Sequence, residues 1–301
     1  MNDQTHLIVG PGALGRLLAM HLAGIAPVAL AGRRALPGEQ TLTTPEGTLR
    51  RRRLATYVVN RLPSVTPAFL HLTTKAYAAE AAYATVMQHL PGTPTLVLWQ
   101  NGYQVQPALS CRHPGPVLCA STTEGAWLDG DEGVTHAGRG VTYLGNLENR
   151  HVRRSRALAA LLGQAGLAAE AVDDIAFRLW HKLAVNAAIN PLVARFRIRN
   201  GQLRDRPFRP MVERIIDEVA RIAAAEGIPP PAGGWRALVW RVVENTASNR
   251  ASMLQDVLAA RPTEREAILG PLLAAARRHD IATPCLNELD ATLARAAMPQ
   301  R

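Results

Sequence analysis

Short apolar runs that end in small or polar residues recur through the first half of the chain. Residues 6–9 form such a run, which stops at Gly10, and a helical pattern follows over residues 13–23. The next apolar run, residues 27–31, ends in Gly32-Arg33-Arg34. A strand, a helix and a second strand in this order form a βαβ unit, so the pattern predicts a parallel sheet.

Later apolar runs predict further strands of the same sheet, at residues 69–73, 95–99 and 117–120. They end in Thr74-Lys75, Gln100-Asn101-Gly102 and Ser121-Thr122-Thr123. Ligands bind at the carboxyl ends of strands in an open parallel sheet, so these endings are candidate site loops. A glycine-rich alternation over 133–145 predicts a hairpin at the sheet edge. A helix over 152–164 and a last strand over 168–172 follow.

The pattern changes after residue 174 to long helical periods divided by proline-rich turns such as Pro229-Pro230-Pro231. The helices are expected at residues 175–195, 207–226, 235–248 and 263–279. We therefore predict an α/β protein of two domains. A Rossmann-type, doubly wound parallel sheet spans residues 1–172, and an all-helical domain spans residues 173–301.

Composition supports two globular domains, because the 301 residues are 48% hydrophobic and 19% charged. Three cysteines are too few for a disulfide framework or a structural zinc site, so we expect a reducing compartment and no metal. The first residues lack the basic start of a signal peptide, and the apolar stretch of residues 17–31 is interrupted by Gly24 and Pro27. We expect a cytoplasmic protein without a membrane partner.

The net charge of +10 suits either a nucleic-acid binder or an enzyme of anionic substrates. Arginines cluster at residues 50–53 and 153–156, but no aromatic-rich RNA-binding signature or zinc-finger spacing accompanies them. We interpret these clusters as solvated basic surface and expect no nucleic-acid partner.

The segment Gly10-Pro11-Gly12-Ala13-Leu14-Gly15 matches G-x-G-x-x-G and lies between a predicted strand and a predicted helix. In this motif Gly10 permits the tight turn, Gly12 lets a pyrophosphate approach the backbone, and Gly15 allows close packing of helix and strand. The segment therefore predicts dinucleotide binding, with the pyrophosphate at the helix N-terminus. The alternative is a glycine-rich turn without a ligand.

Cofactor choice depends on the end of the second strand, where NAD-specific proteins usually carry Asp or Glu for the ribose 2′-hydroxyl. Here Arg33 and Arg34 occupy that place. A guanidinium group binds phosphate oxygens well, so we predict NADP(H), selected by Arg33 with help from Arg34. The alternative is a pair of exposed loop arginines.

A polar stripe crosses an otherwise apolar helical segment, because Lys182, Asn186 and Asn190 follow one another at intervals of four residues. A helix that is apolar on its other faces is buried, and a buried lysine with two amides needs partners or a ligand. The alternative is an internal hydrogen-bond network with a snorkelling lysine. Pro191, which lacks an N–H group, should end or kink this helix.

The segment K-L-A-V-N-x-x-I-N-P-L, residues 182–192, resembles the signature helix of ketopantoate reductases. The resemblance runs almost end to end and also includes, in family order, the N-terminal G-x-G-A-L-G, Thr74-Lys75-Ala76, Asn101-Gly102, Ser121-Thr122-Thr123, Glu244-Asn245, Ser252-Met253-Leu254-Gln255-Asp256 and Thr263-Glu264. It implies a substrate and catalytic role for the helical domain.

The resemblance assigns catalysis to Lys182 and Glu264. Lys182 matches the general acid that protonates the carbonyl oxygen as hydride arrives, and Glu264 matches the carboxylate near that lysine. Reduction of a ketone creates an alkoxide that needs such a donor. Burial would lower the pKa of Lys182, and Glu264 would oppose this shift if close. Without the resemblance, Glu264 could be an acidic first-turn residue of a helix whose capping box is formed by Thr263 and Glu266.

The resemblance also assigns the binding residues. Asn186, Asn190 and Ser252 match residues that contact the substrate, while Lys75 and Asn101 match residues beside the cofactor. Ser252 by itself could be a helix-boundary serine, and Asn101 with its glycine could be a plain turn.

The implied activity is the NADPH-dependent reduction of 2-dehydropantoate to (R)-pantoate, on the route to pantothenate and coenzyme A. Two alternatives stay open: a related reductase of another small 2-oxo acid or dicarbonyl, and a non-catalytic NADP-binding regulator. Glu124 and Leu269 depart from the family pattern at places that could alter the substrate pocket. We expect a small 2-oxo acid as partner, and the sequence leaves a homodimer open.

Overall fold

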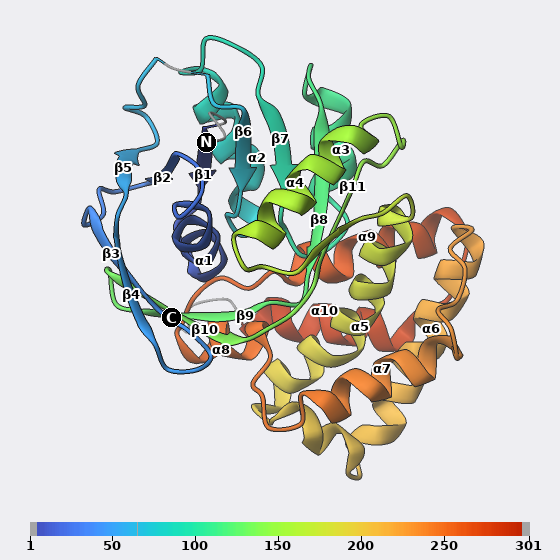
Figure 1. Cartoon of the computed structure of the whole chain (residues 1–301). Coiled ribbons are helices and arrows are strands. Elements are labelled where there is room, and N and C mark those ends of the chain that lie inside the picture. The colour runs from blue at the N-terminus through green and yellow to red at the C-terminus, as the bar shows by residue number, and fades with distance from the viewer. Residues whose placement is uncertain (1–4, 65, 297–301) are drawn as a thin grey trace. The chain divides into compact units, whose positions relative to one another are not determined.

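The chain forms two compact units in the computed structural model, which describes residues 5–64 and 66–296 (Figure 1). Among the described residues, the first unit contains 5–64, 66–100 and 105–176, and the second contains 101–104 and 177–296. The first unit thus extends past the predicted boundary at residue 172, and a segment of four residues leaves it for the second unit. Residues 1–4 and 297–301 of the predicted domains lie outside the described residues.

An eight-stranded sheet forms the centre of the first unit, in the order β12-β11-β8-β7-β6-β1-β2-β5. Its strands are β1 (His6–Val9), β2 (Val28–Gly32), β5 (Ala55–Val58), β6 (Phe69–Leu72), β7 (Thr95–Leu98), β8 (Val117–Thr122), β11 (Thr142–Gly145) and β12 (Ala169–Ala171). All neighbours run parallel except β8 and β11. Every residue of β1, β6, β7 and β8 is buried, as is usual for strands covered on both faces. The predicted Rossmann-type sheet is confirmed, with two strands at one edge, β11 and β12, that run opposite to the other six.

Four helices accompany this sheet: α1 (Ala13–Leu22), α2 (Ala76–Met87), α3 (Val105–Arg112) and α4 (Val152–Gln164). A second, four-stranded sheet was not predicted and has the order β4-β3-β10-β9. Its strands are β3 (Glu39–Thr43), β4 (Leu49–Arg53), β9 (Gly125–Asp129) and β10 (Gly133–Gly138). Helix α1 lies between the two sheets and contacts both (Figure 1). Strand β4 is an exposed, arginine-rich edge, and such charge opposes pairing with other chains.

The predicted hairpin over residues 133–145 is wrong. Strand β10 pairs with β9 and β3 in the second sheet, whereas β11 pairs with β8 and β12 in the first. The actual hairpin joins β9 to β10 through a turn at Gly130, whose φ is +66°. The dipeptide Asp129-Gly130 is a typical hairpin signal that the sequence analysis did not use.

A chain of neutral aromatic rings lies within the first sheet. Trp99 Nε1 donates to His71 Nδ1 at 3.1 Å, so His71 must carry its proton on Nε2. That group therefore donates to His6 Nδ1 at 2.9 Å, and the His6 proton is on Nε2, which has no partner among the described residues. Burial lowers the pKa of His6 to about 4 and the pKa of His71 well below its usual value.

We expect these histidines to make the fold acid-labile. The folded pKa of His6 lies below the unfolded value of 6.5, so the unfolded chain binds more protons between pH 6.5 and pH 4 and stability falls as pH falls through this range. The loss from His6 is about 3 kcal/mol, from 1.36 kcal/mol for each pKa unit. Thermal unfolding measured from pH 7 to pH 4 checks this. His6→Asn, which keeps an acceptor but does not titrate, should flatten the curve, and exposed His89→Asn should not; an unchanged curve for His6→Asn would contradict the assignment.

In the second unit every element among the described residues is a helix, as predicted. It contains α5 (Ile175–Phe196), α6 (Phe208–Ala225), α7 (Gly234–Asn245), α8 (Ser252–Leu258), α9 (Arg265–Arg278), α10 (Pro284–Ala296) and a short 3-10 helix at Asn200–Arg204. Helix α5 supplies the centre of the core, where Leu183, Ala187 and Leu192 are almost completely buried. Each fully buried leucine contributes about 1.5–3 kcal/mol, so α5 is held firmly by its neighbours.

Candidate active site

The glycine-rich segment forms a tight turn between β1 and α1. Gly10 has φ +104°, and a Cβ there would lie 2.5 Å from the backbone nitrogen of Thr74. A Cβ on Gly15 would lie 2.3 Å from the Gly10 carbonyl oxygen. At Gly12, by contrast, a Cβ would meet nothing within 4 Å. Two glycines therefore permit close packing, and the third leaves open space beside the backbone.

The start of α1 fits an anionic group. Gly12 is its N-cap, no side chain caps the helix, and its first turn contains no acidic residue. The first N–H groups of an α-helix, here those of Ala13 and Leu14, have no acceptor within the helix and point toward an anion. Together with the open space at Gly12, this arrangement fits a dinucleotide pyrophosphate.

The two arginines after β2 differ in their surroundings. Arg33 is exposed and makes no hydrogen bond or ion pair with another described residue. Arg34 is also exposed, but its guanidinium donates to both carboxylate oxygens of Asp131. Arg34 is thus held by an acidic side chain that the sequence analysis did not single out, and Arg33 is the more open of the two groups.

Lys75 lies at the carboxyl end of β6, where it is the N-cap residue of α2 and is half-buried. The neighbouring Thr73 hydroxyl donates to the carbonyl oxygens of Val9 and Gly10, at 3.1 and 2.7 Å. These bonds join the end of β6 to the glycine turn. The structure therefore places Lys75 beside the same strand ends as the glycine-rich segment.

Helix α5 carries Lys182, Asn186 and Asn190 on one face, at the spacing predicted. Asn190 is only 6% exposed, while Lys182 and Asn186 are half-buried. The amide groups of Asn186 and Asn190 form no hydrogen bond with any described residue, so they are not members of an internal network. The helix continues past Pro191 to Phe196, so Pro191 does not end it, and the predicted helical span of residues 175–195 is confirmed.

Lys182 has a perturbed acid–base equilibrium. Burial lowers its pKa to about 8, and the nearby Glu264 carboxylate acts in the opposite direction. A lysine with such a pKa retains its proton near neutral pH but releases it far more readily than an exposed lysine. The structure therefore brings the two predicted catalytic residues close enough to interact.

Glu264 is 5% exposed and stands at the N-cap of α9, where its side chain makes no capping hydrogen bond. The alternative capping box of Thr263 and Glu266 is wrong, because the helix begins one residue later than that box requires. Instead, Glu264 Oε2 accepts a hydrogen bond of 3.1 Å from Asn101 Nδ2. The carboxylate is thus oriented by an amide rather than by the start of its helix.

Asn101 belongs to the segment 101–104, which packs within the second unit. Gly102 has φ +86°, and a Cβ there would lie 2.1 Å from the carbonyl oxygen of Ala267. Tyr103 contacts Trp180 of α5, with ring centroids 5.6 Å apart. No local sequence pattern indicates these contacts. They fix the position from which Asn101 reaches Glu264.

Ser252 is the first residue of α8 and is exposed. It makes no hydrogen bond with Lys182, Glu264 or Asn101 in the described chain.

The two residues that depart from the family pattern, Leu269 and Glu124, both have contacts within the fold. Leu269 is fully buried in the helical core. Glu124 accepts hydrogen bonds from His136 Nε2 at 2.6 Å and from the Gly140 N–H at 3.0 Å.

Across residues 5–64 and 66–296, no group of three or more His, Cys, Asp or Glu side chains is arranged to hold a metal ion. None of the helices in that part of the chain has both the length and the apolar character needed to cross a membrane.

Comparison with known proteins covers nearly the whole chain. Residues 6–149 match the family model described as ketopantoate reductase PanE/ApbA, and residues 174–296 match the model of its C-terminal domain. The 2-dehydropantoate 2-reductase of Vibrio cholerae is 36% identical over 94% of each chain, and that of Archaeoglobus fulgidus is 34% identical over 91% of each.

Solved structures share the fold at lower identity. The 2-dehydropantoate 2-reductase of Geobacter metallireducens superposes with a TM-score of 0.86 at 24% identity, covering 97% of this chain and 99% of the other. D-mandelate dehydrogenase, in a ternary structure with NADH and anilino(oxo)acetate, superposes with a TM-score of 0.85 at 22% identity, covering 97% and 98%.

Proposed function

Because the chain belongs to the ketopantoate reductase family, we propose that it reduces 2-dehydropantoate to (R)-pantoate with NADPH. This reaction is a step in pantothenate and coenzyme A biosynthesis. The observation that carries the proposal is Lys182, whose pKa partial burial lowers to about 8. It interacts with Glu264 and shares one helix face with two amides that have no hydrogen-bond partner among the described residues. A non-catalytic NADP-binding regulator has no use for such a proton donor.

We assign cofactor binding to the first unit and substrate binding with catalysis to the second. The bound NADPH supplies hydride to the carbonyl carbon. Gly10, Gly12, Ala13, Leu14 and Gly15 form the pyrophosphate turn, and its open space and uncapped helix start support this role. Arg33 faces solvent where a 2′-phosphate would be bound, and Lys75 lies at a neighbouring strand end.

Lys182 donates the proton that the carbonyl oxygen acquires as the alkoxide forms. The lowered pKa of Lys182 lies closer to the pH at which the enzyme works, and this match favours proton transfer from the ammonium group. Glu264 keeps the ammonium form populated, and the Asn101 hydrogen bond holds that carboxylate in place. Asn186 and Asn190 are assigned to the substrate because their amides are available, and Ser252 is assigned on family resemblance alone.

A panel of 2-oxo acids, with oxidation of NADPH followed by absorbance, tests the proposed substrate. We expect kcat/KM for 2-dehydropantoate to exceed that for 2-oxoisovalerate and for the 2-oxo acid of mandelate by about tenfold or more, because hydrogen-bonding groups discriminate strongly against analogues that leave them unpaired. A higher value for another 2-oxo acid would assign the chain to a related reductase instead.

The pH dependence of the reaction should depend on Glu264. The general acid acts in its protonated form, so kcat/KM should fall as pH rises through about 8. Glu264→Gln removes the charge that raises the pKa of Lys182, so the fall should begin at lower pH. Glu266→Gln, an exposed residue of the same helix, is the matched control and should leave the profile unchanged. A profile that is the same in Glu264→Gln and wild type would show that Glu264 does not tune Lys182.

The proposed setting is the cytoplasm, with the enzyme as a homodimer. The three cysteines are free thiols, which supports a reducing compartment. Sedimentation of the purified chain measures its oligomeric state.

A further inference from the structure

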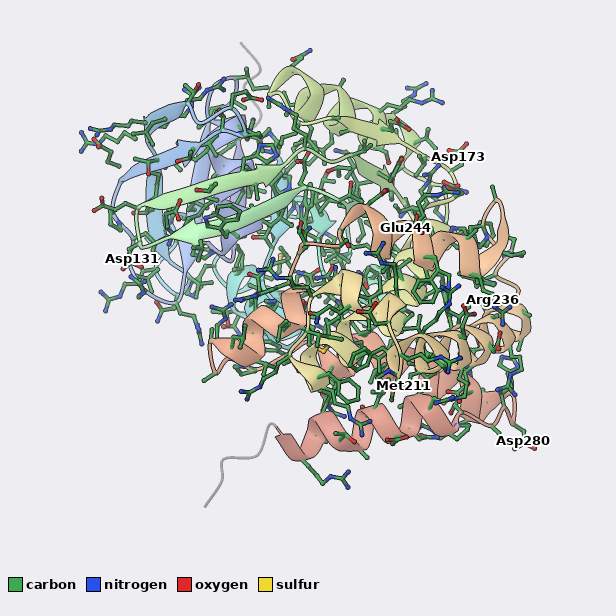
Figure 2. The ribbon with its side chains drawn as sticks, turned by 90° about the horizontal axis from the view of Figure 1, so that it is seen from below. Asp131, Asp173, Met211, Arg236, Glu244 and Asp280 are labelled. Carbon is green, nitrogen blue, oxygen red and sulfur yellow. The ribbon has the colours of Figure 1, made fainter. Side chains whose placement is uncertain are left out.

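An acidic side chain stands at the place where the sequence suggests phosphate recognition. Asp131 lies in the turn between β9 and β10 and forms a two-pronged ion pair with Arg34, which follows β2. Figure 2 shows Asp131 at the end of the green strands of the second sheet. The two residues are 97 positions apart in the sequence, so only the fold brings them together.

Several contacts fix the turn that carries Asp131. The Gln40 side-chain amide donates to the Asp131 carbonyl oxygen at 3.4 Å, and the Thr41 N–H donates to the next carbonyl, that of Glu132, at 2.7 Å. The Arg16 guanidinium, buried on α1, donates to Gly130 in this turn at 3.2 Å and to Pro11 in the glycine-rich segment at 3.0 Å. The Arg16 side chain therefore links the turn to the predicted dinucleotide-binding segment.

The region around Arg34 carries charges of both signs. Arg16, Arg33 and Arg34 each carry a positive charge, and Asp131 interacts electrostatically with Arg16 as well as with Arg34. Hydrogen bonding to the Arg34 guanidinium lowers the pKa of Asp131, so the carboxylate is ionised at neutral pH. A 2′-phosphate carries about two negative charges and would be repelled by this carboxylate, whereas an uncharged ribose 2′-hydroxyl can donate a hydrogen bond to a carboxylate.

We propose that Asp131 is a second determinant of cofactor choice. It weakens the binding of a 2′-phosphate by Arg33 and Arg34, and so reduces the preference for NADPH over NADH. This inference rests on the proposed dinucleotide-dependent function. NAD-specific proteins carry an acidic residue at the end of their second strand. In this chain the acidic group, Asp131, comes instead from the turn between β9 and β10. Asp131 acts by competing for Arg34 and by adding negative charge, and needs no change in the fold.

Titration of the protein with NADPH and with NADH, without substrate, tests the proposal through the ratio of the two dissociation constants. Asp131→Asn should raise the preference for NADPH about threefold to tenfold at low salt, and less at about 0.5 M salt, where such charges are screened. Glu132→Gln removes the same charge one residue away, from an exposed side chain that contacts neither arginine, and should change the ratio by less. Arg33→Asp should lower the preference and so shows that the titration detects 2′-phosphate recognition.

Asp131→Ala provides a second variant, and thermal unfolding verifies that each variant is folded, since an exposed ion pair contributes little to stability. An unchanged or reduced NADPH preference in both Asp131 variants would overturn the proposal and show that Asp131 instead supports Arg34. An equal gain in Glu132→Gln would also overturn it. This test does not depend on the substrate. If the wild-type protein bound NADPH but did not reduce 2-dehydropantoate, the proposed function would be contradicted, yet the ratio of the two dissociation constants could still be measured.

Discussion

Replacing Lys182 by alanine is expected to lower kcat by about 10²–10⁴-fold, the usual range for loss of a general acid. Lys182 is the one group on the polar face of α5 that can release a proton, and its pKa of about 8 suits this role. NADPH affinity and the fold should stay near normal, because the predicted pyrophosphate turn lies in the other unit. Steady-state kinetics on 2-dehydropantoate, with a separate NADPH titration, measure both effects.

Variants along the same helix face separate rate from binding. Lys182→Met removes the proton donor but retains much of the side-chain volume, so it should lose as much rate as the alanine variant without a packing defect. Asn186→Ala and Asn190→Ala should chiefly raise KM, since neutral amides bind and orient the substrate. Near-normal kcat in Lys182→Met would mean that another group protonates the carbonyl oxygen. Loss of NADPH binding would make Lys182 a cofactor residue instead.

Gly102→Ala is expected to damage both stability and catalysis. A Cβ there would lie 2.1 Å from the Ala267 carbonyl oxygen, and the φ of +86° is unfavourable for alanine. Backbone strain alone costs about 1–3 kcal/mol, and the clash adds to it. Since Asn101 is the preceding residue, the displaced segment should also release Glu264 and lower kcat by about tenfold or more.

Gly47→Ala is the matched control for this substitution. Gly47 has nearly the same φ, +84°, but a Cβ there would meet nothing within 4 Å. It should show the strain penalty alone, with unchanged kcat. Thermal unfolding and steady-state kinetics on the two variants measure the difference. If both lost the same stability and neither lost rate, the packing of residues 101–104 would have no part in holding Glu264.

The sequence predicted those features that depend on neighbouring residues. Periodicity identified α1 and α4, since a helix repeats its apolar face every three to four positions, whereas α5 was recognised as a long apolar segment with one polar stripe. Short apolar runs identified β1, β6 and β7. The glycine spacing before α1 and the stripe on α5 followed from local geometry in the same way. Helices α2, α3, α8 and α10 were not predicted, and α2 and α3 have weak apolar periodicity that hides them.

Strand partners were harder to predict, because pairing joins residues far apart in the chain. Strands β10 and β11 look like a hairpin locally, yet they enter different sheets, since each finds its partners elsewhere. Strand pairing in the second sheet was hard to predict for the same reason. Its strand β3 is parallel to β10, more than eighty residues later, and no local pattern indicates that pairing.

By itself, the sequence determined the two-domain α/β fold, the dinucleotide-type turn and the face of α5 that carries Lys182. Only the tertiary structure decided that Asn101 reaches Glu264 across 163 positions, that Asp131 holds Arg34, and that Lys182 is buried enough for its pKa to fall to about 8. The physical reason is that periodicity and turn chemistry act between near neighbours. Desolvation, ion pairing and hydrogen-bond partners depend instead on which distant segments the folded chain brings together.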